Sequence, residues 1–172
     1  ESPATSTLEL VQMSEQAAMD LSSGIAAFEA KHFSRAMQLL SPLAEAGDAD
    51  AQHRLAIMYQ NGLGCARNDE FAEKWMRAAA EQGHALAQHG LGFMYLEGEC
   101  VAQDSAQAAK WFRLAAEQGL AGSQTTLAMM YEQGNGVPQD AEEAAKWYRK
   151  AADQGLVNAQ FGLGIMYANG EG

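Results

Sequence analysis

Small and apolar residues follow one another along this chain at spacings of three and four, and each such group returns after 36 residues. Ala51, Leu55 and Met58 form the first clear group, and Ala87, Leu91 and Met94 repeat it. Spacings of three and four place residues on one face of a helix. The pattern therefore predicts a first set of helices, the A helices, over residues 50–61, 86–97, 122–133 and 158–168.

A second helical pattern, the B helices, lies between the A helices. It carries Ala72, Trp75 and Ala79 in its first copy and returns with the same period. A glycine-rich loop precedes each B helix. A glycine in the left-handed conformation is expected at the C-terminal end of each B helix, because glycine has no Cβ to strain that conformation. The predicted N-caps are Asn68, Asp104 and Asp140, the last two with a capping-box residue three positions on, and the predicted terminal glycines are Gly83, Gly119 and Gly155.

A fixed period between about 20 and 50 residues is typical of a stacked-repeat solenoid. Alternating A and B helices predict an all-α fold of helix-turn-helix repeats. Ala or Gly at positions 56, 92, 128 and 164 should let neighbouring helices approach closely. The periodic aromatic residues are interpreted as structural core: Tyr59, Trp75, Tyr95, Trp111, Tyr131 and Trp147.

The segment from Leu127 to Gln160 resembles the Sel-1-like repeat, a relative of the tetratricopeptide repeat. The matching residues are Leu127, Met130, Tyr131, Gly134, Gly136, Val137, Asp140, Ala144, Trp147, Tyr148, Ala151, Ala152, Gln154, Gly155, Ala159 and Gln160. The segment from Leu91 to Gln124 matches as well, except that Cys100 replaces the second loop glycine. The first full repeat departs more, with Cys65, Asn68 and Met76 at positions where the family has Val, Asp and Tyr.

This resemblance implies a right-handed α/α superhelix that acts as a non-enzymatic adaptor for protein or peptide partners, in a family whose bacterial members are often exported. The chain is then one repeat domain, 1–172. Its expected parts are a mobile tail at 1–8, a tetratricopeptide-like first hairpin at 9–47, full repeats at 48–83, 84–119 and 120–155, and a partial repeat at 156–172 that we expect to continue.

Positions that vary from one repeat to the next are the candidates for partner contact, because the recurring positions are explained by the core. The A helices should line the concave side of such a superhelix, where apolar and Met-rich surfaces suit a bound peptide or helix. An alternative is that Ile57, Phe93, Met129 and Ile165 simply pack between adjacent A helices, which leaves His89 and Leu96 as the better exposed contacts. The candidate set is His53, Ile57, Gln60, His89, Phe93, Leu96, Thr125, Met129, Glu132 and Phe161.

Residues with reactive side chains are present, but their spacing does not predict catalysis, and we expect no metal and no cofactor. His53 and His89 occupy equivalent positions on successive A helices, about 9–10 Å apart at ordinary helix spacing, too far for shared zinc without further ligands. Cys65 and Cys100 lie in successive loops and form a possible disulfide if their Cα atoms come within about 7 Å. No nucleophile elbow, P-loop or zincin motif is present.

Charge narrows the class of partner. The formal net charge is −11 and the isoelectric point is near 4.7, which argues against nucleic acid and anionic membrane surfaces and favours a basic partner. No apolar run approaches the roughly 18 residues that a membrane span needs. The sequence does not indicate an oligomeric state.

The chain begins at Glu1 without an initiator Met or an apolar signal core. We expect either a mature protein after signal cleavage, periplasmic or secreted, or an excised piece, with a cytoplasmic protein as the alternative. The rival function is an envelope module that binds carbohydrate or a cell-wall fragment, with His and aromatic residues stacking on sugars.

Overall fold

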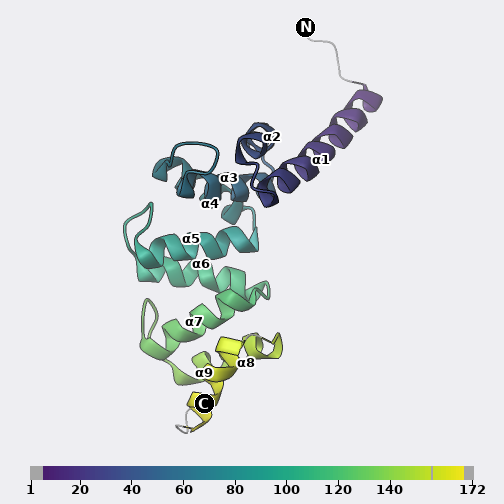
Figure 1. Cartoon of the computed structure of the whole chain (residues 1–172). Coiled ribbons are helices and arrows are strands. Elements are labelled where there is room, and N and C mark those ends of the chain that lie inside the picture. The colour runs from purple at the N-terminus through teal and green to yellow at the C-terminus, as the bar shows by residue number, and fades with distance from the viewer. Residues whose placement is uncertain (1–5, 156, 169–172) are drawn as a thin grey trace. The chain divides into compact units, whose positions relative to one another are not determined.

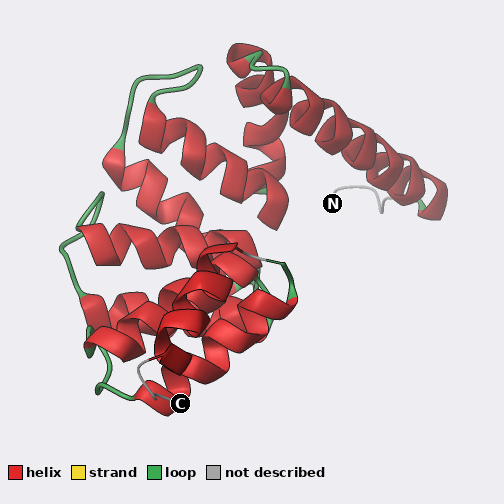
Figure 2. Ribbon diagram, turned by 60° about the horizontal axis from the view of Figure 1, so that its bottom comes forward, coloured by secondary structure: helices red, strands yellow, loops and turns green. Residues whose placement is uncertain are grey.

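The computed structural model describes residues 6–155 and 157–168, and at 157–159, 161 and 167 it describes only the helical backbone. Within these residues every regular element is an α-helix, joined by short loops (Figure 2). The predicted all-α class is therefore confirmed. The helices of the described residues are α1 (Thr7–Glu29), α2 (Phe33–Glu45), α3 (Ala49–Asn61), α4 (Asp69–Glu81), α5 (Ala85–Glu97), α6 (Ser105–Glu117), α7 (Ala121–Gln133), α8 (Ala141–Asp153) and α9 (Val157–Ala168).

The A helices α3, α5, α7 and α9 begin one residue before the predicted positions and end where predicted. Three of them end because the next residue is a glycine in the left-handed region: φ is 67° at Gly62, 68° at Gly98 and 68° at Gly134. Only glycine adopts this conformation at little cost, so one residue type fixes the same helix end three times.

The B helices α4, α6 and α8 begin at the predicted caps. The side-chain oxygens of Asn68, Asp104 and Asp140 each accept a hydrogen bond from the amide three residues on, at 2.9, 3.1 and 3.1 Å. These bonds satisfy amides that have no partner inside the helix. The predicted terminal glycines follow, with φ of 90°, 94° and 85° at Gly83, Gly119 and Gly155.

The chain divides into two compact units, Glu1–Trp75 and Met76–Gly172, hereafter unit 1 and unit 2. In unit 1, helices α1, α2 and α3 pack on one another around a core that includes Leu40, Leu55 and Met58. In unit 2, each helix from α5 to α9 packs on the next one. Its core includes Phe112 and Leu127.

Helix α1 differs from the others in length. It has 23 residues, whereas each of α2 to α8 has 13, and its N-terminal part extends beyond α2 in Figure 1. It begins at Thr7, inside the tail expected at 1–8, because Ser6 and Glu9 form a complete capping box. Residues 1–5 of that expected tail lie outside the described residues.

The periodic aromatic residues lie in the cores or pack against them. Trp111, Trp147 and Tyr131 are buried in unit 2, and Tyr95 packs against the same cluster. Tyr59 and Trp75 are half-buried against the core of unit 1. These rings are therefore packing residues.

The small residues behave as predicted at three of the four positions. A Cβ at Gly92 would lie 2.9 Å from the ring of Phe112, and Ala56 and Ala128 are fully buried. Gly164 is exposed and has nothing within 4 Å of such a Cβ, and there the close approach stays a prediction. Gly92 faces the B helix that follows it in its own repeat, and the described residues stop at 168 before another B helix.

Glutamine side chains join successive repeats of unit 2. Gln118 donates to the carbonyl of Gly83 and to Oε1 of Gln88, both at 2.8 Å. Gln154 makes the equivalent bonds one repeat later, to Gly119 and Gln124, both at 2.9 Å. We call these four glutamines (Gln88, Gln118, Gln124 and Gln154) the glutamine ladder.

Candidate protein-interaction surface

Six of the varying positions lie on two A helices of unit 2, α5 and α7. We call them the unit 2 A-helix face: Leu86, His89, Phe93, Leu96, Met129 and Glu132. Apolar side chains remain at the surface here, because Leu86 is 51% exposed and Met129 is 44% exposed. Most other large apolar side chains described in unit 2 are buried or half-buried, so these two contribute less to its core.

His89 links the two helices of this face. Its Nδ1 lies 2.6 Å from Oγ of the fully buried Ser123 on α7. Its ring makes edge-to-face contacts with Phe93 at 4.9 Å and with Phe112 at 5.5 Å between centroids. Burial lowers the pKa of His89, so the ring is neutral near pH 7. His89 was expected as an exposed contact, but in the structure it is half-buried and connects α5 to α7 through Ser123.

Phe93 and Leu96 form the middle of the face. The Phe93 ring lies 4.9 Å from that of Phe112 and packs edge-to-face on it. Both Phe93 and Leu96 are half-buried against the core cluster of unit 2. Phe93 thus packs on the B helix α6, while Met129 remains open to solvent, and the alternative of packing between adjacent A helices stays a prediction.

The two polar members of the candidate set on α7 are already engaged. Thr125 is buried, and its hydroxyl donates to the carbonyl of Ala121 at 3.2 Å; its assignment to an open contact surface is therefore wrong. Glu132 accepts a hydrogen bond from Tyr148. Burial, and then this bond and the charge of Glu132, raise the pKa of Tyr148 well above its usual range.

The remaining candidates lie outside this face. His53, Ile57 and Gln60 are half-buried on α3, which belongs to unit 1. The side chain of Phe161 lies outside the described residues. The candidate surface is therefore restricted to unit 2.

Cys65 and Cys100 are both half-buried thiols. Cys65 Sγ lies 3.6 Å from the carbonyl oxygens of Met58 and Leu63, and burial raises its pKa. Because Cys65 belongs to unit 1 and Cys100 to unit 2, a bridge between them stays a prediction.

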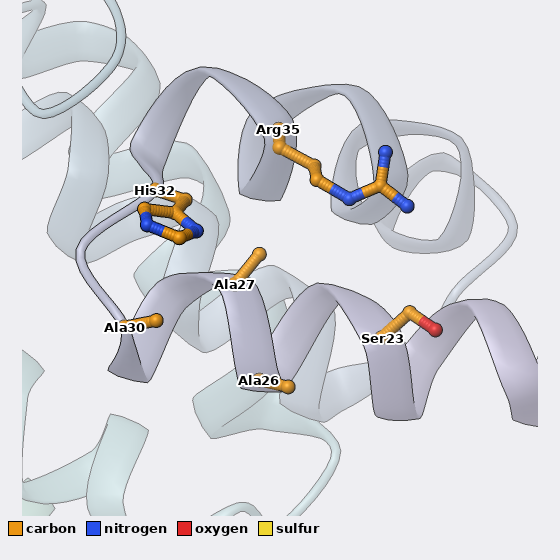
Figure 3. Close-up of a pocket in the computed structure, with 6 residues that line it drawn as sticks. All are labelled: Ser23, Ala26, Ala27, Ala30, His32 and Arg35. Atoms are coloured by element: carbon orange, nitrogen blue, oxygen red, sulfur yellow. The ribbon is translucent and has the colours of Figure 1, made fainter.

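Unit 1 has a concavity of its own beside the turn between α1 and α2 (Figure 3). It measures about 360 Å³, and α1 supplies Ser23 and a floor of alanines, while His32 and Arg35 lie opposite. Its polar lining consists of hydroxyl, imidazole and guanidinium groups without a carboxylate. The polar groups of this concavity are therefore mainly hydrogen-bond donors.

Sequence reasoning left Leu86 of this face out of its candidate set, and it also missed the two buried residues that contact His89, Phe112 and Ser123. A signal existed for Ser123, because the equivalent positions in the other repeats are Ala51, Ala87 and Ala159. A hydroxyl where the repeat otherwise has a methyl group needs a partner when buried, and His89 is that partner. Within the described residues, no three His, Cys, Asp or Glu side chains gather as a metal site would require.

The helices of the described residues include none with the length and apolarity of a membrane span.

The family model described as "Sel1 repeat" matches residues 49–84, 85–120, 121–156 and 157–172. No curated protein matches the chain.

Two solved structures share substantial sequence with the chain. One is a Sel1 repeat protein from Oxalobacter formigenes, with 35% identity and a TM-score of 0.83, covering 87% of this chain and 62% of that one. Another is c5321, described as a protective antigen of uropathogenic Escherichia coli with an SLR fold. It has 41% identity and a TM-score of 0.77, covering 78% of this chain and 29% of that one. The chain thus spans less than two thirds of either protein.

Helicobacter pylori cysteine rich protein B shares the fold, with 20% identity and a TM-score of 0.60, covering 74% of this chain and 92% of that one.

Proposed function

Because the chain belongs to the Sel1 repeat family, whose members are generally non-catalytic scaffolds, we propose that it binds a protein or peptide partner through the unit 2 A-helix face. The observation that carries this proposal is the exposure of Leu86 and Met129 beside half-buried Phe93 and Leu96. An apolar surface set among packed aromatic rings is the kind of site that an amphipathic helix or an extended peptide occupies.

Rigidity supports the same proposal. His89, Ser123 and Phe112 hold α5 and α7 in one arrangement, so the surface is formed before a partner arrives. A preformed surface avoids the free-energy cost of ordering side chains on binding. A neutral, half-buried imidazole is also compatible with an apolar partner at pH 7.

The test is a peptide-display selection against the wild-type chain, followed by affinity measurement of the selected peptides. The double variant Leu86→Glu/Met129→Glu should bind them at least tenfold more weakly, because each charge would be buried against apolar groups. Both side chains are substantially exposed, so the fold should tolerate the change. Leu114→Glu is the matched control, because Leu114 is an exposed leucine on α6.

Equal loss of affinity in the double variant and the Leu114→Glu control would sink the proposal. A saturable response to peptidoglycan fragments or oligosaccharides, lost in the double variant and without any selected peptide, would instead favour the carbohydrate-binding function.

We further propose a periplasmic or secreted location. The E. coli relative is described as a protective antigen, and antigens of that kind are accessible outside the cytoplasm.

A further inference from the structure

The N-terminal half of α1 carries apolar side chains at the surface. Leu10 is 55% exposed and Met13 is 64% exposed, and Leu8, Val11 and Met19 are exposed as well. At 1.5 Å per residue, α1 is about 34 Å long and the 13-residue α2 only about 20 Å. Helix α2 therefore cannot cover the first turns of α1, which extend past it in Figure 1.

Leu10 belongs to a row of residues that continues the packed face of α1, whereas the other exposed apolar side chains lie outside this row. Spacings of four and three run through residues 10, 14, 17, 21, 24 and 28, which is the pattern of a helix–helix seam. The C-terminal end of the row packs on α2: a Cβ on Gly24 would lie 2.6 Å from Cδ2 of Leu40. The N-terminal end of the same row, Leu10, Ser14 and Ala17, is exposed.

A concavity lies beside this exposed half. It measures about 480 Å³ and lies between α1 and the turn that joins α2 to α3. Helix α1 contributes Ser14, Ala17, Ala18 and Leu21, and the other wall includes Leu43 and Asp48. Small residues on the α1 side leave room for the backbone of another helix to approach closely. We call the row Leu10–Leu21 together with this concavity the α1 seam.

The charge around the α1 seam has one sign. Residues 7–29 contain four acidic residues (Glu9, Glu15, Asp20 and Glu29) and no Lys, Arg or His. Asp48 lies in the wall of the concavity, and Glu45 ends α2 beside it. Helix α2 has no basic residue in its last turn, so no cation in that turn offsets the negative end of its dipole beside the concavity.

We infer that the α1 seam is the docking site for a basic amphipathic helix from another protein. Its apolar stripe would occupy about three turns along Leu10–Leu21, and its Lys and Arg side chains would flank that stripe. A second copy of this chain fits less well, because pairing two α1 helices would place acidic side chains against acidic ones. This inference concerns unit 1 and goes beyond the proposed function, which rests on unit 2.

The test uses the full chain and two labelled synthetic peptides with the same leucine stripe, one flanked by Lys and the other by Glu. We expect the Lys peptide to bind at least tenfold more tightly, and more weakly as salt is added because surface charges are screened. Fluorescence anisotropy gives both dissociation constants.

Two variants with the same charge change locate the site. Ala17→Arg places a large cation in the seam and should weaken the Lys peptide at least tenfold, whereas Gln12→Arg lies on another face of α1 and should leave the affinity within twofold. Circular dichroism and the thermal midpoint of both variants check that α1 stays folded.

Four outcomes would overturn the inference. The Lys peptide could bind both variants alike, or the Glu peptide could bind the wild type as tightly as the Lys peptide does. A wild-type dimer in sedimentation that Ala17→Arg abolishes would assign the seam to a second copy of the chain. Flotation with phosphatidylcholine vesicles that Ala17→Arg abolishes would assign the seam to a lipid surface.

Discussion

Cys100 occupies a backbone position that the other repeats give to glycine. Its φ is 66°, close to the 71° of Gly64 and the 76° of Gly136. A side chain in this left-handed region costs about 1–2 kcal/mol. Cys100→Gly should therefore raise the free energy of unfolding by about 1 kcal/mol, after allowance for the greater freedom of glycine in the unfolded chain.

Urea unfolding at constant m-value measures this change. Cys100→Ala is the control, because it removes the thiol and keeps the Cβ. Equal stability of the two variants would show that the backbone conformation at Cys100 is not the source of strain.

Gly136 offers the reverse experiment, because two separate terms oppose a side chain there. Its φ is positive, and a Cβ would lie only 2.2 Å from the carbonyl oxygen of Ser105. Gly136→Ala should lower the free energy of unfolding by about 3 kcal/mol. Gly134→Ala should cost about 1–2 kcal/mol, because its φ is similar but its nearest contact, the Cβ of Gln139, lies 3.1 Å away. A Gly134→Ala loss as large as that of Gly136→Ala would contradict the role of the Ser105 carbonyl.

His89 makes stability depend on pH. Burial lowers its pKa in the folded chain below the value of about 6.5 that it has when unfolded. As the pH falls below about 6.5, the unfolded chain binds a proton that the folded chain resists, so the stabilising contribution of neutral His89 decreases. The wild type should lose more stability between pH 7.5 and 5.5 than His89→Gln does, in matched urea titrations. Parallel losses in the two proteins would assign the pH effect to other groups.

At the scale of elements, the glutamine ladder adds hydrogen bonds to the side-chain packing between repeats. Gln124 donates to the carbonyl of Ala116 at 3.1 Å and accepts from Gln154 at 2.9 Å. Gln124→Leu would remove both of these hydrogen bonds, which together contribute about 1–3 kcal/mol to stability. Gln133→Leu on the same helix is exposed and should change stability by less than about 0.5 kcal/mol. Equal effects on the unfolding midpoint would refute the ladder.

The bounds of the A and B helices could be predicted because local residues determine them. Asp104 and Asp140 fix where helices begin, and Gly98 and Gly134 fix where they end, through bonds or φ angles within a few residues of sequence. Helix α1 lacks such periodic signals. Its start depends on Ser6 and Glu9, in a segment that the sequence suggested was a tail.

The candidate surface was harder to predict than the fold, because its contacts join elements far apart in sequence. The position of His89 depends on Ser123, which is 34 residues away, and on Phe112 of the intervening helix. The burial of Thr125 likewise depends on the packing of α7 among its neighbours. Helical periodicity assigns a residue to a face, but only the packed neighbours determine whether that face is open.

At the scale of the whole molecule, the two units should respond separately to a core mutation. Trp147 is buried in unit 2, and its truncation to Ala should cost about 3–5 kcal/mol. In a repeat array each element contacts only its neighbours, so instability spreads over a limited distance. Hydrogen exchange should therefore show protection lost mainly in α5–α8, with α2 and α3 retaining theirs. A uniform loss of protection over both units would contradict this expectation.

The contacts made by the glutamine ladder and by Gly136 have a consequence for how such a chain can change length. Gln154 donates to the backbone of Gly119, and Gly136 lies against the backbone of Ser105. Every residue has a backbone carbonyl group, whatever its side chain. The contacts of one repeat with the preceding repeat therefore depend little on the sequence of that preceding repeat. A duplicated 36-residue segment would thus carry the glutamine and the glycine that make these contacts. The repeat before it would already present the backbone carbonyl groups that they contact. Gene duplication could lengthen this array one unit at a time without simultaneous compensating mutations.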